Sequence, residues 1–419
     1  MHKKMMPARA VCAGILSHWL ETEAFPDRML PHDHTAHALI QEMVFGCLRW
    51  YGALKWRILQ LVPRDPDPTS LGFLLTGMYQ LFYMDNIPPH AAVHETVEAA
   101  KVTLDPARCR FLNAVLRNAI RQRDTLETNL RKAPLAARWS HPAHLIQRWQ
   151  QALGESQTEA LCRWNNERPS VCLRVYRHHT KSAQQLLNTL APHPAAPDAF
   201  RIVPGGTNLE ELPGFQDGTF YVQDPATELA VNLLDPQPGM RVLDACAAPG
   251  GKTFACADKM QDQGTIIALD RHADRLERMA ANVKRMRFSI VELHRADATR
   301  PAELTAKQPF DRILLDVPCS NTGVLQRRPD ARWRITPERI QAMTDVQTRI
   351  LDATAPLLAN NGVLVYSTCS LEPEENITCI NNWIEQHPQY AITATRTSIP
   401  PASGMDGAFA ARIERKDAS

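Results

Sequence analysis

The spacing of hydrophobic residues is helical in the first third of the chain. From residue 1 to about 135, apolar positions recur every three or four residues, as in HTAHALIQEMVFGCLRWYGALKWRILQLV and DPARCRFLNAVLRNAIRQRD. Almost no strand signal interrupts this period. The second segment opens on Asp105 and Pro106, a pair typical of a helix start. We therefore expect an all-α N-terminal domain over residues 1–135.

The pattern becomes mixed in the next hundred residues. HLIQRWQQALG and QTEALCRWNNE, within residues 140–170, keep the helical period. SVCLRVY and AFRIV then predict two strands, and KSAQQLLNTLA predicts a helix between them. Residues 136–234 are expected to form a helical linker followed by a small α+β module.

After Asp235, strand-like and helical segments alternate. Near-continuous apolar runs predict the strands MRVLDAC, TIIALD, SIVELH, FDRILLD and GVLVYST. Strands that are apolar on both sides and separated by helices are typical of a parallel sheet covered on both faces. Residues 235–419 are thus expected to form a Rossmann-like doubly wound α/β sheet, with GAFAARIE as an edge strand.

Composition is that of an ordinary globular protein of two or three domains: 419 residues, 44% hydrophobic and 22% charged. No apolar run reaches the roughly 20 residues of a membrane-spanning helix. The N-terminal apolar run is short and lacks a clear cleavage site, so a helix is expected there and not a signal peptide. We expect a cytoplasmic protein that binds no membrane.

Cysteine and histidine usage gives no sign of a metal site. The ten cysteines include no CxxC pair and follow no secretory signal, which favours reduced thiols and argues against a zinc ribbon. His32, His34 and His37 cluster in HDHTAH, but no cysteine or carboxylate completes a ligand set at a suitable spacing. We expect no metal.

Charge is unevenly distributed. Residues 1–200 hold 23 Lys and Arg against 17 Asp and Glu, whereas residues 201–419 hold 24 against 28. One predicted helix is crowded with arginines: Arg108, Arg110, Arg117, Arg121 and Arg123. Two interpretations stay open for this helix, which are contact with RNA phosphates and an ordinary solvated face.

Acidic residues follow the predicted strands at the edge where doubly wound sheets bind ligands. After the first strand comes DACAAPGGKT, a Gly-rich turn that leads to a helix N-terminus and matches neither GxxxxGK[ST] nor GxGxxG. The strand-end acids are Asp244, Asp270, Asp297 and Asp316. A single such Asp is more often a cap or turn residue. Four at successive strands favour a ligand made of a nucleoside and an amino acid.

Two cysteines lie at the ends of neighbouring predicted strands. Cys319 in DVPCSNTG and Cys369 in STCS stand in polar, turn-forming contexts, unlike the other cysteines in apolar runs. A functional role and core packing are about equally supported by this context. The segment EPEEN after Cys369 predicts a helix start with carboxylates suited to its N-terminus.

Three of these segments together resemble motifs of a known enzyme family. DACAAPGGKT, LLDVPCSNTGVLQRRPDARW and YSTCSLEPEEN are similar to motifs of the RNA 5-methylcytosine methyltransferases that use S-adenosylmethionine. CRFLNAVLR resembles the last part of a NusB-like RNA-binding domain, and NNERPSVCLRV, GFQDGTFYVQD and DGAFAARIE also match. Over nearly its whole length the chain resembles the bacterial 16S ribosomal RNA cytosine-5 methyltransferases of the Sun/RsmB type.

This resemblance implies three domains and one activity. It implies a NusB-like RNA-binding domain (1–135), a helical linker with a small α+β RNA-binding module (136–234) and a methyltransferase domain (235–419). The implied reaction moves a methyl group from S-adenosyl-L-methionine to C5 of a cytosine in 16S ribosomal RNA, through a covalent adduct of a cysteine with C6. We expect a monomer that binds no DNA. The alternatives are a transfer RNA cytosine-5 methyltransferase and a non-catalytic RNA-binding assembly factor.

The resemblance also implies roles for individual residues. Cys369 is the implied nucleophile, and Cys319 is implied to help release the product. Asp270 is implied to bind ribose, Asp297 adenine, and Asp316 to lie beside the methionine end of the cofactor and the target base. The implied cofactor loop comprises Cys246, Ala247, Ala248, Pro249, Gly250, Gly251 and Lys252.

A rival assignment reverses the two cysteines. DNA 5-methylcytosine enzymes use a Pro-Cys pair, which here would select Cys319 after Pro318, whereas Thr368-Cys369 fits the RNA arrangement. A basic loop follows Cys319, with Arg327, Arg328, Arg332, Trp333 and Arg334. Two interpretations stay open for it, which are phosphate binding with a stacking surface and a buried structural Trp333.

Overall fold

The computed structural model describes residues 5–22, 24–176, 180–301 and 308–416. Contacts divide the chain into two compact units. The helical unit comprises Met1–Glu167 and Leu325–Arg334, and the sheet unit comprises Arg168–Val324 and Ile335–Ser419. In the described part of the chain, no helix is both long enough and apolar enough to cross a membrane.

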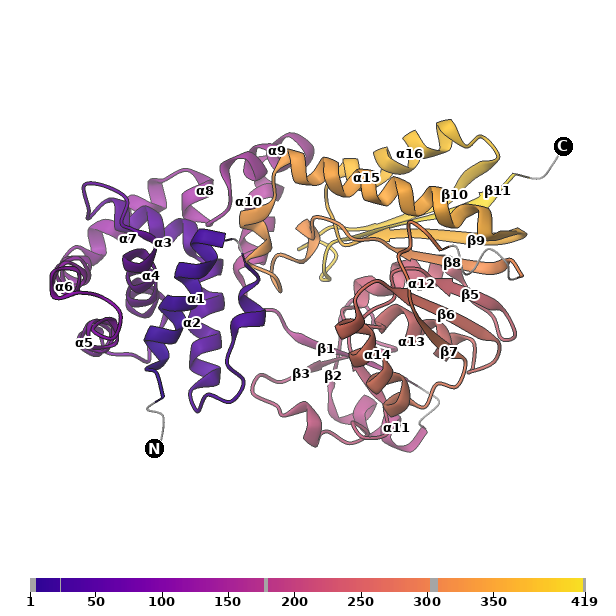
Figure 1. Cartoon of the computed structure of the whole chain (residues 1–419), viewed down its shortest axis with the longest axis horizontal. Helices are drawn as coiled ribbons and strands as arrows, with labels where there is room; N and C mark the ends of the chain where they lie inside the picture. Colours follow the sequence, from indigo (N-terminus) through magenta and orange to yellow (C-terminus); the bar gives the residue numbers. More distant parts are fainter. Residues whose placement is uncertain (1–4, 23, 177–179, 302–307, 417–419) are drawn as a thin grey trace. The chain divides into compact units, whose positions relative to one another are not determined.

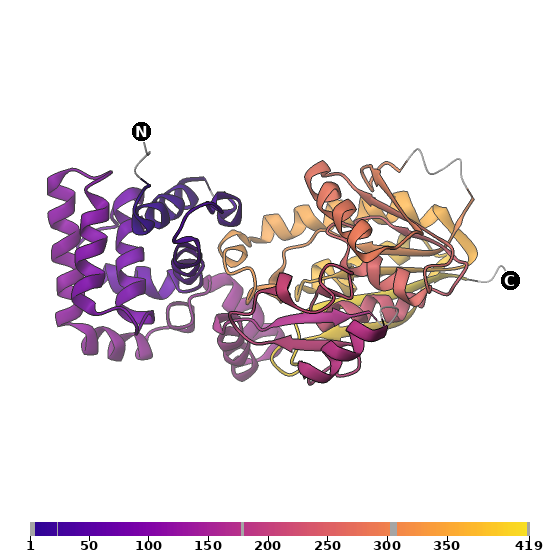
Figure 2. The same cartoon turned by 90° about the horizontal axis from the view of Figure 1, so that it is seen from below.

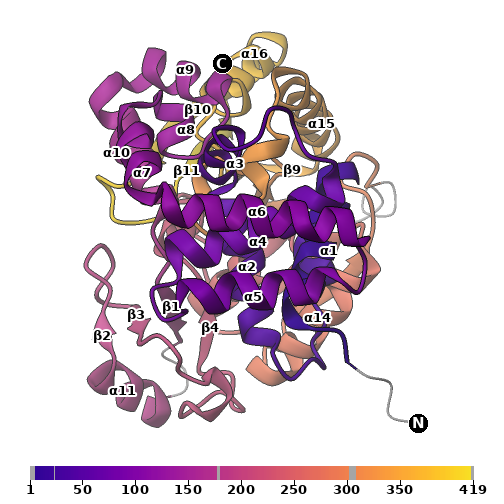
Figure 3. The same cartoon turned by 90° about the vertical axis from the view of Figure 1, so that its left-hand side faces the viewer.

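The helical unit confirms the expected all-α N-terminal domain. Its helices are α1 (Ala8–Thr22), α2 (His37–Arg49), α3 (Tyr51–Leu59), α4 (Pro68–Tyr83), α5 (Pro89–Ala100), α6 (Pro106–Arg121), α7 (Arg123–Lys132), α8 (Leu135–Arg138), α9 (Ala143–Leu153) and α10 (Glu155–Asn166). Asp67 and Asp105 cap α4 and α6 by accepting backbone N–H bonds. Helix α4 is the centre of this unit, since almost every residue from Ser70 to Leu81 is buried. Helices α5 and α6 lie alongside each other and α4 (Figures 2 and 3).

A segment from the second half of the sequence completes the helical unit. Leu325–Arg334 is anchored by Arg332, whose guanidinium is fully buried. Arg332 donates five hydrogen bonds, the shortest of them 2.7 Å to Asn166 Oδ1 and 3.0 Å to the carbonyls of Ser140 and Asn165. Burial, together with the nearby charge of Arg49, lowers the pKa of Arg332 to about 9. A phosphate-binding role for Arg332 is therefore wrong.

The neighbouring Trp333 has a structural role too. Its Nε1 donates to the carbonyl of Leu48 at 2.8 Å, and its ring meets Tyr51 edge-on at 5.0 Å between centroids. A Cβ atom on Gly52 would lie 3.0 Å from the Trp333 ring, so helix α3 leaves room for the indole at this glycine. Trp333 is half-buried and not fully buried as expected, and these contacts support its structural interpretation.

The sheet unit begins with the expected small α+β module. Its elements are β1 (Val171–Val175), α11 (Thr180–Thr189), β2 (Ala191–Pro192), β3 (Phe200–Val203) and β4 (Phe220–Val222). The strands pair antiparallel in the order β2-β3-β1-β4. Ala183 and Leu186 of α11 pack with Leu173 and Phe220 of the strands in one small core.

The large sheet is mostly parallel. Its strands are β5 (Arg241–Asp244), β6 (Thr265–Asp270), β7 (Val291–Arg295), β8 (Phe310–Asp316), β9 (Leu358–Thr368), β10 (Tyr390–Ser398) and β11 (Ala408–Arg415). Their order is β10-β11-β9-β8-β5-β6-β7, with parallel pairing from β9 to β7. The chain runs outward from β5 in one direction and then from β8 in the other. The switch point therefore lies between β5 and β8, which is where such folds bind ligands.

Two cores cover the two faces of this sheet. Helices α12 (Glu228–Leu234), α13 (Gly251–Lys259) and α14 (Ala273–Met286) share one core with alternate strand residues such as Val363 and Val365. Helices α15 (Pro337–Thr354) and α16 (Ile377–Gln386) share the other core with Leu364 and Tyr366 (Figure 1). Short 3₁₀ turns complete the chain: η1 (Pro26–Met29), η2 (Leu209–Glu211), η3 (Pro225–Thr227), η5 (Thr322–Val324), η6 (Ala331–Arg334), η7 (Ala355–Leu357) and η8 (Pro373–Glu375).

The last strand is not at the sheet edge, so that expectation was wrong. Strand β11 lies between β9 and β10 and pairs antiparallel with both. Its successive residues Ala410 and Ala411 are both fully buried, one in each core. The edge belongs to β10, whose sequence YAITATRTS alternates polar and apolar residues and was missed because it lacks a continuous apolar run.

We predict that Arg332→Met destabilises the helical unit by about 3 kcal/mol, because the five acceptors that Arg332 bonds lose their donor. Calorimetric melting of the full chain measures the change, and Arg328→Met is the matched control. Arg328 is exposed in the same segment, and its replacement is expected to change stability by less than about 0.5 kcal/mol. Equal effects of the two substitutions would contradict an anchoring role for Arg332.

Candidate functional site

Three acidic side chains converge where the parallel strands end. Asp244, Asp270 and Asp316 are the last residues of β5, β6 and β8, which are neighbours in the sheet. Burial raises the pKa of the Cys246 thiol well above its ordinary value, and the charges of all three carboxylates add to the shift. Cys246 therefore lies among the three acids.

Asp244 supports the loop that follows β5. It is 1% exposed, and its Oδ2 accepts a hydrogen bond from Thr253 Oγ1 at 2.7 Å. Its other oxygen, Oδ1, is buried without a hydrogen-bond partner of normal geometry among the described residues. Burial raises the pKa of Asp244 to about 7, although the bond from Thr253 opposes the shift. This carboxyl group can gain or lose a proton near neutral pH.

The loop needs glycine at Gly250. This residue has φ of +110°, and a Cβ atom there would lie 2.4 Å from the Phe254 ring. The amide of Phe254 donates to the Gly250 carbonyl at 2.8 Å, so α13 starts directly from the loop. The small module also reaches this loop, because Tyr221 OH donates to the Pro249 carbonyl at 3.1 Å. The result is a tight turn with the N–H groups of a helix start beside it.

Lys252 carries a positive charge into the group of acids. Its Nζ lies 2.6 Å from Asp316 Oδ2, and its side chain is only 15% exposed. Burial alone would lower the pKa of Lys252, but attraction to Asp316 and Cys369 outweighs burial and raises it. Lys252 thus stays a cation that neutralises Asp316 and lies close enough to Cys369 to act on its charge.

The other two predicted acids make turn bonds. Asp270 is 7% exposed, and its Oδ1 accepts from the amide of His272 at 2.8 Å. Asp297 is exposed after β7, and its Oδ1 accepts from both the amide and the hydroxyl of Thr299. These bonds lower the pKa of Asp297. Both residues lie at strand ends as expected, but Asp297 is exposed whereas Asp244 and Asp270 are buried.

The two cysteines are in contact. Cys319 Sγ and Cys369 Sγ are 3.4 Å apart at the ends of the adjacent strands β8 and β9. Cys369 also donates to Asn321 Oδ1 at 3.2 Å, and Asn321 donates to the carbonyl of Cys319 at 2.9 Å. Residues 50 positions apart in sequence therefore form one thiol pair, which is the pair that the sequence singled out.

The environments of the two thiols differ. The hydrogen bond with Cys369, followed by burial, raises the pKa of the Cys319 thiol well above its ordinary value. Cys319 is 9% exposed, whereas Cys369 is only half-buried. Cys319 is thus a thiol that keeps its proton, and it lies within hydrogen-bond distance of the Cys369 sulfur. Cys369 is the sulfur that an outside molecule reaches.

A buried carboxylate holds the two cysteine loops together. Glu375, fully buried in η8, accepts at Oε1 from the amide of Ser320 at 2.8 Å and from Gln347 Nε2 at 3.3 Å. At Oε2 it accepts from the hydroxyls of Ser320 and Ser370. Burial raises the pKa of Glu375, and the bonds from the two serines oppose that shift. Each serine directly follows one of the cysteines, so the carboxylate fixes both loops relative to each other.

Sequence reasoning missed this role of Glu375. The acids of EPEEN were expected at a helix N-terminus, but α16 begins only at Ile377 and Glu375 faces the cysteine loops instead. The one signal in the sequence was the repeated dipeptide Cys-Ser at 319–320 and 369–370, which places a hydroxyl beside each cysteine that a nearby acceptor can bind. In the described part of the chain, no group of three or more His, Cys, Asp or Glu residues could hold a metal ion.

Three family models match successive parts of the chain. The NusB family matches residues 6–121, the ferredoxin-like domain of the Methyltr_RsmF/B-like proteins matches residues 141–211, and the 16S rRNA methyltransferase RsmB/F family matches residues 231–414. The first match lies within the helical unit, the second runs from the last helices of that unit into the small module, and the third covers the large sheet.

Curated relatives match over nearly the full length. The chain is 37% identical over 430 residues to the ribosomal RNA small subunit methyltransferase B of Yersinia pseudotuberculosis serotype O:1b (strain IP 31758). The same identity holds for the protein of that name from Yersinia pestis bv. Antiqua (strain Angola). Each alignment covers 97% of this chain and 98% of the relative.

Solved structures share the fold. The crystal structure of PH0851 superposes with a TM-score of 0.79 over 98% of this chain and 99% of that chain, at 24% identity. A methyltransferase homolog protein from Pyrococcus horikoshii superposes with a TM-score of 0.59 at 27% identity, over 67% of this chain and 98% of that chain. The chain is 37% identical to the curated relatives over nearly its full length, and three family models match it in succession. This chain therefore belongs to the 16S rRNA methyltransferase RsmB/F family.

Proposed function

We propose that this chain transfers a methyl group from S-adenosyl-L-methionine to C5 of a cytosine in 16S ribosomal RNA. The observation that carries the proposal is the contact between the Cys319 and Cys369 sulfurs, 3.4 Å apart beside an acid-lined ligand edge. Membership of an rRNA methyltransferase family and the names of the curated relatives support the substrate. A pair of thiols, one half-buried and one kept protonated, supports chemistry on the base and not on a ribose oxygen.

The residues at the strand ends fit the cofactor. The buried Oδ1 of Asp244 lacks a partner among the described residues, and only one oxygen of Asp270 accepts a bond from them. Asp270 is thus suited to accept from ribose hydroxyls, the loop Cys246–Lys252 to line the nucleoside, and Asp297 to contact adenine. Asp316 would lie near the amino-acid end, where its charge and that of Lys252 complement a zwitterion. When bound, S-adenosylmethionine supplies a methyl group on a positively charged sulfur.

Cysteine chemistry explains how C5 becomes reactive. C5 of cytosine is a poor nucleophile, but addition of the Cys369 thiolate at C6 creates an enamine-like base whose electron density lies at C5. C5 then takes the methyl group, a base removes the C5 proton, and the bond between C6 and Cys369 Sγ breaks. The Cys319 sulfur lies 3.4 Å from the same sulfur, so its S–H group is placed to stabilise the thiolate by a hydrogen bond as it leaves. The target base must leave its stack to reach the thiols.

Exchange of each cysteine tests the proposed reaction. We predict that Cys369→Ser lowers tritium release from C5-labelled 16S rRNA on the order of 10³-fold or more and forms no covalent complex, because a serine hydroxyl is a far weaker nucleophile. We predict that Cys319→Ala accumulates an enzyme–RNA adduct that survives a denaturing gel. The two variants serve as each other's control, since they differ by one thiol of the same pair.

Two results would overturn the assignment. Adduct formation with normal turnover by Cys369→Ser would make Cys319 the nucleophile. Release of methylated product by Cys319→Ala at the wild-type rate would remove its role in elimination. The same assay with transfer RNA as acceptor separates the ribosomal substrate from the alternative one, and bisulfite sequencing of the reacted 16S rRNA identifies the modified base.

We call the hydrogen bonds that Glu375 accepts from Ser320, Ser370 and Gln347 the Glu375 clamp. Loss of this clamp is expected to impair turnover without impairing cofactor binding. Glu375→Gln replaces an acceptor oxygen by an NH₂ group that faces two donors, so the loops of Cys319 and Cys369 lose their fixed separation. We expect kcat to fall about 10- to 100-fold while calorimetry shows unchanged affinity for S-adenosylmethionine. Glu385→Gln, an exposed glutamate of α16, is the matched control and should keep full activity. Normal kcat in Glu375→Gln would count against the clamp.

For Gly250→Ala, the geometry of the loop after β5 predicts weaker binding of S-adenosylmethionine, in contrast to Glu375→Gln. A methyl group at φ of +110° and 2.4 Å from the Phe254 ring forces the loop to move. We expect calorimetric affinity for S-adenosylmethionine to fall about tenfold or more, since this strain costs roughly 1–3 kcal/mol. Gly205→Ala, where a Cβ atom meets nothing within 4 Å and φ is not positive, is the control. Unchanged affinity would place the cofactor elsewhere.

A further inference from the structure

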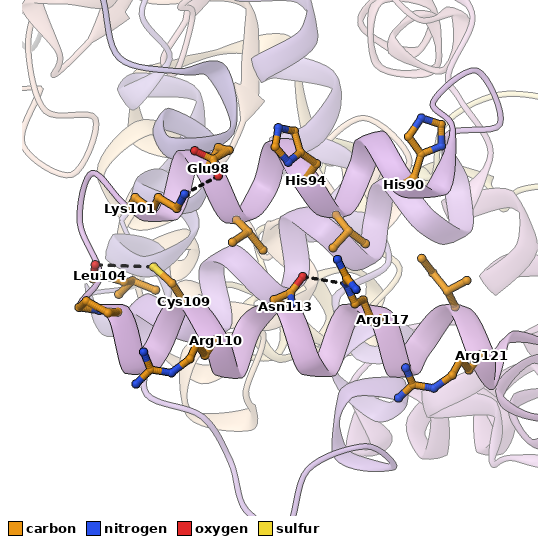
Figure 4. Close-up of a pocket in the computed structure, with 14 residues that line it drawn as sticks. His90, His94, Glu98, Lys101, Leu104, Cys109, Arg110, Asn113, Arg117 and Arg121 are labelled. Atoms are coloured by element: carbon orange, nitrogen blue, oxygen red, sulfur yellow. Dashed lines mark hydrogen bonds and ion pairs between the residues drawn. The ribbon is translucent and has the colours of Figure 1, made fainter.

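A groove lies between helices α5 and α6 of the helical unit, apart from the cysteine site. It has a volume of about 960 Å³. Figure 4 shows the two helices running side by side in opposite directions, with charged and polar side chains along both rims. The groove lies wholly within the helical unit. None of the chemistry proposed above uses it.

The floor of the groove is aliphatic. Val93 and Leu104 are buried at its base, and Ile120 lines it while remaining 38% exposed. The lining contains no Phe, Tyr or Trp side chain. Such a floor can support the apolar faces of sugars, but it offers no broad aromatic surface on which bases would stack.

A row of guanidinium groups follows the α6 rim. Arg110, Arg117 and Arg121 are all exposed and line the groove. Positions 110 and 121 are about 16 Å apart along a helix that rises about 1.5 Å per residue. Arg117 donates to Asn113 Oδ1 at 3.1 Å, and Arg121 donates to Asn118 Oδ1 at 3.2 Å. Both amides are neutral, so these bonds orient the arginines without cancelling their charge.

The α5 rim adds donors and almost no negative charge. His90, His94 and Lys101 line this side (Figure 4). Glu98 is the single carboxylate in the lining, and Lys101 Nζ pairs with it at 2.5 Å. The three arginines of α6 are therefore an excess of positive charge that no carboxylate of the lining offsets.

The remaining arginines of this stretch have other contacts. Arg108 pairs with Asp67 and Asp105 at 3.6 and 3.5 Å, and Arg123 stacks over the ring of Phe82. Neither lines the groove. The arginines that seemed one cluster in sequence thus divide into two with local structural partners and three aligned along one concave surface.

We propose that the α5–α6 groove binds a strand of the RNA substrate through its phosphates. The proposal rests on the function proposed above and adds a second RNA-binding site to it. A linear polyanion fits three exposed cations in a row, flanked on the other rim by imidazole and ammonium donors. Because the lining has no Phe, Tyr or Trp ring for a base to stack on and offers mainly charged donors, the groove contacts the backbone and does not read sequence. It therefore holds the RNA while the cysteine site acts on the base.

The test measures RNA binding without cofactor, so it is independent of methyl transfer. Full-length chain and fluorescently labelled 16S rRNA transcript are titrated at several salt concentrations. We expect Arg117→Gln/Arg121→Gln to weaken binding about tenfold and to reduce the slope of log K against log salt by about 1.4–1.8, since each lost phosphate contact removes about 0.7–0.9. Arg131→Gln/Lys132→Gln, which removes the same charge from exposed positions of α7, is the matched control.

A second variant probes the groove itself. Ile120→Glu puts a carboxylate at an exposed position of the lining and is expected to weaken RNA binding as much as the arginine pair, while circular dichroism and melting stay unchanged. If both groove variants bind with wild-type affinity and salt slope, the proposal fails and an acidic protein helix becomes the occupant to test. Equal losses in the α7 control would also refute it, because the effect would then be general charge. Failure of the methyltransferase proposal shows separately, as absent tritium release from wild type.

Discussion

The buried carboxylate of Glu375 is the interaction on which the cysteine site depends. Burying a charge is costly unless donors surround it, and four donors from three separate segments do so here. Three of these donors belong to Ser320 and Ser370, which directly follow the two cysteines in sequence. The cost of burial is offset only when both loops are in place, so the same bonds that satisfy Glu375 fix the 3.4 Å separation of Cys319 and Cys369.

The parallel sheet brings three acids together at one edge, Asp244, Asp270 and Asp316. Burial, and after it the nearby charge of Asp316, raises the pKa of Asp244 to about 7. Lys252 offsets the charge of Asp316. A cationic sulfur bound at this edge would meet an environment already arranged to receive positive charge.

Arginines in the helical unit have two opposite environments, one buried and one exposed. Arg332 is fully buried and donates hydrogen bonds to backbone carbonyls and to one amide oxygen. These bonds hold the segment Leu325–Arg334 in the helical unit. Arg117 and Arg121 stay exposed and donate to neutral amides. The first is a structural anchor for the stretch that follows the Cys319 loop in sequence, and the others keep their charge for an outside partner. Residue type alone did not distinguish these uses.

The sequence by itself determined the all-α first part, the small α+β module, the parallel strands and the candidate cysteines, because periodicity and strand-end chemistry are local properties of the chain. Only the tertiary structure decided what depends on distant neighbours. In the structure, β11 lies inside the sheet and not at its edge, and Glu375 binds the two cysteine loops and not a helix start. Arg332 is buried, and only some of the arginines of 108–123 line the groove. For β11, Glu375 and Arg332 the deciding partners lie far away in sequence, and burial or pairing with them sets the role of the residue.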